Sequence, residues 1–236
     1  MGSGVTPVNH VLSRLPEPEL TRLMGLARHV EHPAAEGLSA PGEPIDTLYF
    51  PLSGMVSIVS ADASGAAVEV VTIGREGIVG VTALFGSPAI PFAALWQLPG
   101  QALAIDLGDL RAILGELPTL MQASAAYLGS LLIQSGQNVA CNRIHDMEER
   151  AAKWRLLTQD RVVGDRIELT QEFFATMLGV TRPKLSLVES TLRRAGLVSA
   201  RRRGSLVILD RAGLEEQSCE CYEVISAELR RFQEQG

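Results

Sequence analysis

The stretch QEFFATMLGVTRPKLSLVES, residues 171–190, decides the fold. Apolar or small residues occupy the seven positions at which two helices joined by a tight turn require them. Gly179 can adopt the positive φ that reverses the chain between the helices. The stretch therefore predicts a helix-turn-helix. The seven residues are Phe174, Ala175, Leu178, Gly179, Val180, Leu185 and Val188.

The flanking residues predict where these two helices begin and end. Thr170 can cap the first helix and Thr181 the second, because a threonine hydroxyl accepts hydrogen bonds from N–H groups of a first turn. Pro183 falls in the first turn of the second helix, where its missing N–H costs nothing. Gly196 follows Ala195 at the position where helices commonly end.

The next stretch, GLVSARRRGSLVILD (196–210), predicts two short strands around an arginine-rich turn. Arg201, Arg202 and Arg203 would stand at the tip of this hairpin, where they can reach phosphates or a minor groove. A hairpin of this kind after a helix-turn-helix is the wing of a winged helix.

Charge is unevenly distributed along the chain, whose formal net charge is −6. Residues 1–140 carry five arginines and no lysine against twelve acidic residues, whereas residues 170–211 carry eight basic residues against three acidic ones. A basic segment on an acidic body indicates that one part is meant for a polyanion. Taken alone, such a charge run favours a merely solvated face.

The first half of the chain changes pattern after a short helical segment. Residues 15–37 are predicted to be helical and local, and short β-rich runs separated by glycines and prolines follow from about 43 to 107. Short strands at this spacing are typical of a jelly roll or barrel. The runs are DTLYFPL, GMVSIVSA, AAVEVVTIG, AALWQLPG and QALAID.

A long helix is predicted from Pro118 to about Arg143, where no proline interrupts apolar residues at helical spacing. Its length would be roughly 35 to 40 Å. Small residues keep this helix slim, so two copies could approach closely about a two-fold axis. We therefore expect a homodimer, the alternative being a core helix of one subunit. The expected interface residues are Met121, Leu128, Leu131 and Ser135.

Together these features resemble the Crp/Fnr family of transcription regulators. The resemblance covers almost the whole chain and rests on YFPLSGMVSIVS, GREGIVGVTALFG and LTQEFFATMLGVTRPKLSLVESTLRRAGLVSARRRGSLVILD. It implies an α+β fold with three parts. These are an N-terminal, jelly-roll-like β-roll similar to cyclic-nucleotide-binding domains over 1–117, a dimerisation helix over 118–145 and a winged helix-turn-helix DNA-binding domain over 146–236.

The resemblance also implies a sequence-specific transcription regulator that binds double-stranded DNA as a homodimer and reads the major groove. RNA polymerase is a candidate partner, and we expect neither a cofactor nor a membrane partner. The residues expected at the DNA are Thr170, Gln171, Thr181, Arg182, Pro183, Lys184, Ser186, Leu187, Ser190, Arg194, Arg201, Arg202 and Arg203.

The chain departs from the cyclic-AMP-binding members of the family, which carry a glutamate after the glycine of the phosphate cassette and an arginine further on. Val81 follows Gly80 here, and neither lysine nor arginine occurs between Arg75 and Arg111. An anionic phosphate would be buried without a counter-charge, so we expect no response to cyclic AMP. A small-molecule effector is not identified, and we expect one, if present, to be apolar or weakly polar. Its expected pocket consists of Val81, Phe85 and Phe92, and the resemblance implies that Gln134 and Ser135 of the long helix also line it.

The cysteines and histidines predict no metal site. Cys141, Cys219 and Cys221 are expected to be buried or inert thiols, with a redox role left open for the last two. His29 and His32 are interpreted as ordinary surface histidines. The N-terminal cysteine cluster of the iron–sulfur oxygen sensors is absent. We find neither a nucleophile–base pair nor a phosphate loop, so an enzyme is not expected.

No run approaches the ~18 consecutive apolar residues of a membrane span, and the N-terminus lacks the pattern of a signal peptide. The expected location is therefore cytoplasmic. The alternative function is a small-molecule-binding sensor whose helix-turn-helix docks a protein partner. Counterion release distinguishes the two, because it makes only DNA binding steeply dependent on salt.

Overall fold

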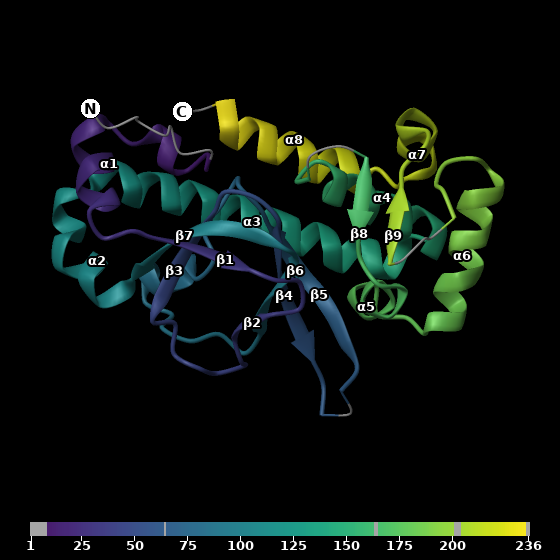
Figure 1. The fold of residues 1–236 in the computed structure, drawn as a ribbon, viewed down its shortest axis with the longest axis horizontal. Coiled ribbons are helices and arrows are strands. Elements are labelled where there is room, and N and C mark those ends of the chain that lie inside the picture. Colours follow the sequence, from purple (N-terminus) through teal and green to yellow (C-terminus); the bar gives the residue numbers. More distant parts are fainter. Residues whose placement is uncertain (1–8, 64, 163–164, 201–203, 235–236) are drawn as a thin grey trace. The chain divides into compact units, whose positions relative to one another are not determined.

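A computed structural model describes residues 9–63, 65–162, 165–200 and 204–234 (Figure 1). The chain folds into two compact units. The β4–β5 hairpin contributes its outer residues to the second unit, and the long helix α3 passes from the first unit into the second. The first unit consists of the described residues up to Val56, Ile73–Leu132 and those from Leu229, and the second of Ser57–Thr72 and Ile133–Glu228.

The chain starts with a short helical region and then forms a strand. After η1 (Leu12–Arg14), helix α1 (Glu17–Met24) begins behind the extended Pro16. The helical prediction for residues 15–37 ends in practice at Met24. It is wrong for β1 (Arg28–His32) and for Gly37, the first residue of β2 (Gly37–Ser39). All five residues of β1 pair with strand β7, and such long-range pairing overrides a local helical pattern.

Two sheets form the β-rich region, as the short runs predicted. One has the strand order β1-β7-β3 and the other the order β2-β6-β4-β5. Leu48, Phe50 and Trp96 are fully buried in the first unit. The remaining strands are β3 (Thr47–Pro51), β4 (Met55–Ala61), β5 (Ala67–Ile73), β6 (Ala93–Leu98) and β7 (Gly100–Asp106).

A short 3-10 helix lies between β5 and β6. It is η2 (Val81–Phe85), and the glycines on either side, Gly80 and Gly86, have φ angles of +87° and +88°. After β7, Asp106 caps helix α2 (Leu107–Ile113), accepting hydrogen bonds from two N–H groups of its first turn. The 3-10 helix η3 (Leu114–Glu116) then leads to the long helix.

The predicted long helix is confirmed as α3 (Pro118–Ile144). Its 27 residues span about 40 Å at the rise of an α-helix. The carboxylate of Glu19 accepts hydrogen bonds from the N–H groups of Thr119 and Leu120, each at 3.1 Å, where the helix dipole favours an anion. Within the described residues, neither α3 nor another helix is long and apolar enough to cross a membrane.

Helix α4 (Met147–Gln159) of the second unit begins with a capping box. Asp146 accepts a hydrogen bond from the N–H of Glu149 at 2.9 Å, and the Glu149 carboxylate accepts one from the N–H of Asp146 at 2.9 Å. In Figure 1 the strands β8 and β9 lie side by side, and a short turn joins α5 to α6. The elements are α4 (Met147–Gln159), β8 (Arg166–Glu168), α5 (Gln171–Met177), α6 (Arg182–Arg194), β9 (Ser205–Val207), α7 (Arg211–Gln217) and α8 (Cys221–Glu234).

A buried carboxylate connects the β4–β5 hairpin to α4. Glu69 accepts hydrogen bonds from the Ser57 hydroxyl at 2.8 Å and from the indole N–H of Trp154 at 3.1 Å. Burial raises the pKa of Glu69 to about 7, against these two donors and the positive charges of Lys153 and Arg161. The carboxyl group therefore keeps its proton well above the pH at which an exposed glutamate ionises.

Replacing Glu69 by glutamine should remove a pH dependence of stability. As pH rises from about 4.5 to 7, the unfolded chain loses this proton while the folded protein retains it, so the wild type loses free energy of unfolding. We expect the free energy of unfolding of Glu69→Gln to be up to about 3 kcal/mol higher than that of the wild type at pH 8. Near pH 4 the two proteins should have the same free energy of unfolding. Urea denaturation across this range measures the difference, with the exposed Glu168→Gln as control. A difference that does not change with pH would contradict the prediction.

Candidate nucleic-acid interface

The first helix and the turn of the motif form as the sequence predicted. The Thr170 hydroxyl accepts a hydrogen bond from the N–H of Phe173 at 3.2 Å and so caps α5. Gly179 has a φ of +66°, and its N–H donates to the carbonyl of Thr176 at 2.9 Å. A side chain larger than hydrogen is strained at this φ, so glycine determines the turn.

The second helix, α6, starts at the predicted place but without the predicted side-chain cap. Thr181 is the N-cap residue with extended backbone angles, yet within the described residues its hydroxyl accepts no bond from the helix. Pro183 lies in the first turn, as expected. An uncapped helix N-terminus has a partial positive charge and can bind an anion such as a phosphate.

The inward and outward faces of α6 largely match the sequence pattern. Leu185, Val188 and Leu192 are 0%, 2% and 1% exposed, whereas Leu187 is 71% exposed. Ala195 is the C-cap that follows the last residue of α6, and it is exposed.

A buried ion pair holds α6 against the rest of the unit. A guanidinium nitrogen of Arg155, on α4, lies 3.0 Å from a carboxylate oxygen of Glu189, and the two side chains are only 2% and 9% exposed. Gln171 donates to Glu189 at 3.0 Å and to the Ser186 hydroxyl at 2.9 Å. The Arg155 guanidinium also lies 4.5 Å above the ring of Phe174. These contacts fasten α6 to both α4 and α5.

Sequence reasoning missed Arg155 and Glu189. A charged residue on an amphipathic helix usually faces water, so neither residue type signals burial. The one available signal is that Glu189 adjoins the apolar stripe of α6.

The predicted DNA-binding residues within the described chain face solvent. Most are exposed, while Gln171 and Ser190 are half-buried. Arg182, at the start of α6, donates to the side chain of Gln171, at the start of α5, at 3.5 Å. The residues are Thr170, Gln171, Thr181, Arg182, Pro183, Lys184, Ser186, Leu187, Ser190 and Arg194.

The wing differs in part from the predicted hairpin. Strand β9 pairs mainly with β8, with Ile167 opposite Leu206. The stretch before the arginines contributes only a single bridge between Val198 and Ile208. Ile167 and Leu206 are both buried, so β8 provides the apolar partner that the hairpin alone lacks. The predicted contacts of Arg201, Arg202 and Arg203 lie outside the described residues.

The residues predicted for the dimer interface all lie on α3 and are half-buried within the chain. The predicted effector residues divide between the two units, so the effector pocket stays a prediction. Val81 is buried and Phe85 is 39% exposed in the first unit. In the second unit, the side chain of Gln134 accepts a hydrogen bond from the N–H of Thr72 at 2.7 Å.

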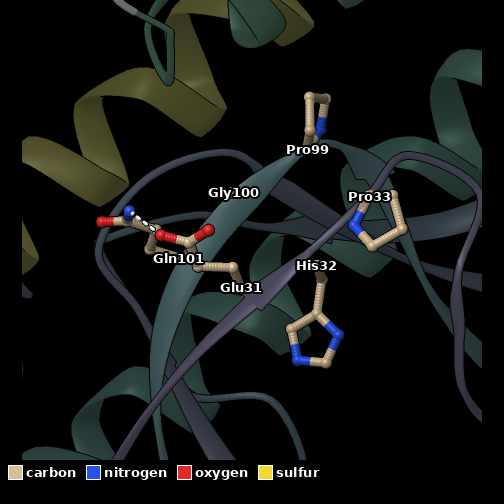
Figure 2. A pocket seen from close by; sticks show the side chains of 6 residues that line it. All are labelled: Glu31, His32, Pro33, Pro99, Gly100 and Gln101. Atoms are coloured by element: carbon tan, nitrogen blue, oxygen red, sulfur yellow. Dashed lines mark hydrogen bonds between the residues drawn. The ribbon is translucent and has the colours of Figure 1, made fainter.

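An open depression lies in the first unit, at the end of β1 and the β6–β7 turn (Figure 2). Gln101 donates to Glu31 across it at 2.6 Å. His32 stacks on Trp96 with ring centroids 5.3 Å apart, so this histidine is a packed residue and not the surface residue expected. None of the predicted effector residues lines this depression. Its lining is Glu31, His32, Pro33, Pro99, Gly100 and Gln101.

Two family models match the chain. The Crp-like helix-turn-helix domain matches residues 143–217, and the cyclic nucleotide-binding domain matches residues 29–116. The chain is also 24% identical over 188 residues to the CRP-like cAMP-activated global transcriptional regulator of Mycobacterium tuberculosis, a match that covers 75% of this chain and 83% of that protein.

Solved structures share the fold. The c-di-GMP responsive global regulator CLP of Xanthomonas campestris is 18% identical, with a TM-score of 0.67 over 83% of this chain and all of that one. FixK2 of Bradyrhizobium japonicum is 18% identical, with a TM-score of 0.68 over 82% of this chain and 98% of that one. The likeness includes the N-terminal sheets, the long helix and the C-terminal helix-turn-helix.

Breaking the buried ion pair should destabilise the second unit. Arg155→Met leaves the Glu189 carboxylate buried without its guanidinium, and we expect a loss of about 3 kcal/mol of unfolding free energy. The double variant Arg155→Met/Glu189→Leu should lose less than the two single variants combined, because no unpaired charge remains.

The control is Arg166→Met, which breaks an ion pair with Glu168 whose side chains are 59% and 66% exposed. It should cost under about 1 kcal/mol. Urea denaturation measures the wild type, Arg155→Met, Glu189→Leu, the double variant and Arg166→Met. Equal losses from the buried and the exposed pair, or strict additivity in the double variant, would contradict the role given to Arg155.

Proposed function

We propose that this chain, which belongs to the Crp/Fnr family of transcription regulators, binds specific duplex DNA sequences as a homodimer and does not respond to cyclic AMP. The observation that carries the proposal is the outward face of α6. Arg182 and Lys184 are exposed beside the uncapped helix start, and the buried Arg155–Glu189 pair holds this helix in place. A rigid cationic helix is what a major groove accepts.

Arg182 and Lys184 would contact guanine or phosphate, while Pro183 and Leu187 pack on thymine methyl groups. Arginine and lysine commonly read the acceptors of guanine, and apolar side chains recognise the thymine methyl. Leu187 is 71% exposed and lies one helical turn after Pro183, which supports an operator with A·T pairs in each half-site. The glutamate and arginine with which cyclic-AMP-responsive members typically read bases are replaced here by Pro183 and Leu187.

The exposed stripe of α3 supports dimerisation. Leu132 and Val139 are 75% and 69% exposed. Successive members of the stripe are four and three residues apart in alternation, which is the spacing of a two-stranded coiled coil. This stripe lies beside the residues that the sequence indicated, and we assign the interface to it. Its members are Ala125, Gly129, Leu132, Gly136 and Val139.

The first unit supports the absence of a cyclic AMP response. Val81, which stands where cyclic-AMP-binding members have glutamate, is 2% exposed. The guanidinium of Arg111 donates to the carbonyl of Ala83 at 3.2 Å, so this cation is engaged by the backbone of η2. The Mycobacterium tuberculosis relative is cAMP-activated. We propose that the present chain lost this response with the glutamate and the arginine of the cassette.

Leu187→Ala tests the reading of DNA. Duplexes selected from random DNA provide the operator, and fluorescence anisotropy at several salt concentrations measures affinity. We expect a steep salt dependence, no change on adding cyclic AMP, and a loss of about 1 kcal/mol for Leu187→Ala on the operator but little on random DNA. Uracil in place of the contacted thymine should reproduce this loss in the wild type and add nothing in the variant.

The control is Leu209→Ala, which shortens another leucine of the second unit that is 61% exposed. It should bind the operator as the wild type does. Equal losses on operator and random DNA would show that Leu187 does not read bases. A shallow salt dependence would favour the alternative, in which the helix-turn-helix docks a protein partner.

Leu132→Glu tests the dimer. A carboxylate in the middle of the α3 stripe would face its own copy across the two-fold axis, so we expect monomers and lost operator affinity. Sedimentation equilibrium measures the mass. Met24→Glu, at a 39% exposed apolar position of α1, is the matched control and should remain dimeric. A Leu132→Glu protein that stays dimeric would place the interface elsewhere.

A further inference from the structure

All three cysteines of the chain meet one histidine in the second unit. Cys141 lies in the last turn of α3, and His145 follows the end of that helix. Cys219 and Cys221 come from the junction between α7 and α8. The ligating atoms of the four side chains all lie within 4.8 Å of one another.

The spacing fits a tetrahedral metal ion. The sulfur atoms of Cys141 and Cys219 are 3.6 Å apart, and the sulfur of Cys221 is 3.4 Å from Nδ1 of His145. Ligands around a tetrahedral Zn²⁺ ion with Zn–S bonds of ~2.3 Å lie about 3.8 Å from one another. Three thiolates and one imidazole are also a common ligand set of structural zinc sites.

The second nitrogen of the histidine has the partner that metal-bound histidines usually have. Nε2 of His145 lies 3.1 Å from a carboxylate oxygen of Glu220, while Nδ1 faces the sulfur atoms. A carboxylate on one nitrogen fixes the tautomer that leaves the other nitrogen free to bind a metal. Gln137 donates a hydrogen bond to the sulfur of Cys221 at 3.1 Å, which orients a second ligand.

Burial and charge also suit a metal–thiolate complex. The three cysteines are between 0% and 3% exposed. Three thiolates, a neutral imidazole and Zn²⁺ carry one net negative charge, and the cations Lys153 and Arg150 of α4 interact electrostatically with Cys141. A buried charge needs such compensation.

We propose that Cys141, His145, Cys219 and Cys221 bind one Zn²⁺ ion in a closed, four-ligand structural site. Binding releases the thiol protons to solvent and changes no oxidation state. The ion would link the end of α3 to the start of α8, two segments 74 or more residues apart in sequence. It replaces the expectation that these cysteines are inert thiols and that the chain has no metal site.

A disulfide is the competing use of the same atoms. The distance of 3.6 Å between the sulfur atoms of Cys141 and Cys219 is well beyond the ~2.05 Å of an S–S bond. A disulfide would also leave His145 and Cys221 without a function in the cluster. The contact between Nε2 of His145 and the Glu220 carboxylate favours a metal site, because a packed cluster of thiols does not require an oriented imidazole.

The test uses the full-length protein, reduced and freed of metal, titrated with Zn²⁺ and separately with Co²⁺. We expect one ion per chain, the intense visible bands of tetrahedral Co²⁺ with thiolate charge transfer, and three thiols that Zn²⁺ protects from a thiol reagent. Zn²⁺ should also raise the midpoint of thermal unfolding, because it binds the folded state preferentially.

Substitutions test which side chains bind the metal and whether Glu220 orients the histidine ligand. Cys141→Ser and His145→Asn should abolish the tetrahedral Co²⁺ spectrum, and Glu220→Gln should retain it but weaken Zn²⁺ binding by about 10-fold. His29→Asn, an exposed histidine in the first unit, is the matched control and should bind as the wild type does.

Three results would overturn the proposal: a wild-type protein whose thiols react equally with and without Zn²⁺, an octahedral Co²⁺ spectrum, or unchanged Zn²⁺ affinity in Cys141→Ser. An intact Cys141–Cys219 disulfide in protein prepared without oxidant would also overturn it. Because thiol protection is measured on the wild type, the proposal can fail even where a variant does not fold. The readouts are independent of DNA binding, so the site and the proposed function can fail separately.

Discussion

The buried ion pair between Arg155 and Glu189 is the constraint on which the exposed face of α6 depends. Apolar contacts through Leu185 and Val188 attach the helix, but hydrophobic burial has no direction and tolerates rotation. An ion pair in a poorly solvated interior is directional, because each charge loses its hydration and only the partner compensates for it. With Gln171 bonded to the same carboxylate, α6 has a single orientation, and its outward side chains acquire fixed positions.

The exposed apolar side chains to which partners are assigned lie on two helices. Leu187 faces outward on α6, and Leu132 with Val139 on α3. Single exposed apolar residues are ordinary, but a repeated series along a helix that also has Gly129 and Gly136 is suited to close approach of a second helix. The two proposed partners, DNA and a second copy of the chain, thus use separate surfaces and can be tested by separate variants.

The cysteine–histidine cluster adds a third role for α3. The helix supplies the dimer stripe along its length. Its last turn contains Cys141, and His145 follows directly after the helix, so this end of α3 provides two members of the cluster. Cys219 and Cys221 bring the start of α8 to the same point. A metal ion there would stabilise the second unit, because the ion binds the folded state preferentially. Glu220 stands between the two cysteines and orients the histidine, so one short segment provides two ligands and their support.

The sequence by itself determined the features that depend on neighbours in the chain. The turn at Gly179, the cap at Thr170, the strands between 47 and 106 and the helix over 118–144 follow from local conformational preferences and from the periodicity of apolar residues. Tertiary structure alone decided the pairing of residues 28–32 with β7, the burial of Arg155 with Glu189 and the meeting of Cys141 with Cys219. These contacts join residues far apart in sequence, and such contacts leave no periodic or spacing signal along the chain. The fold brings them together because buried charges and unpaired strand edges are stable only with a partner.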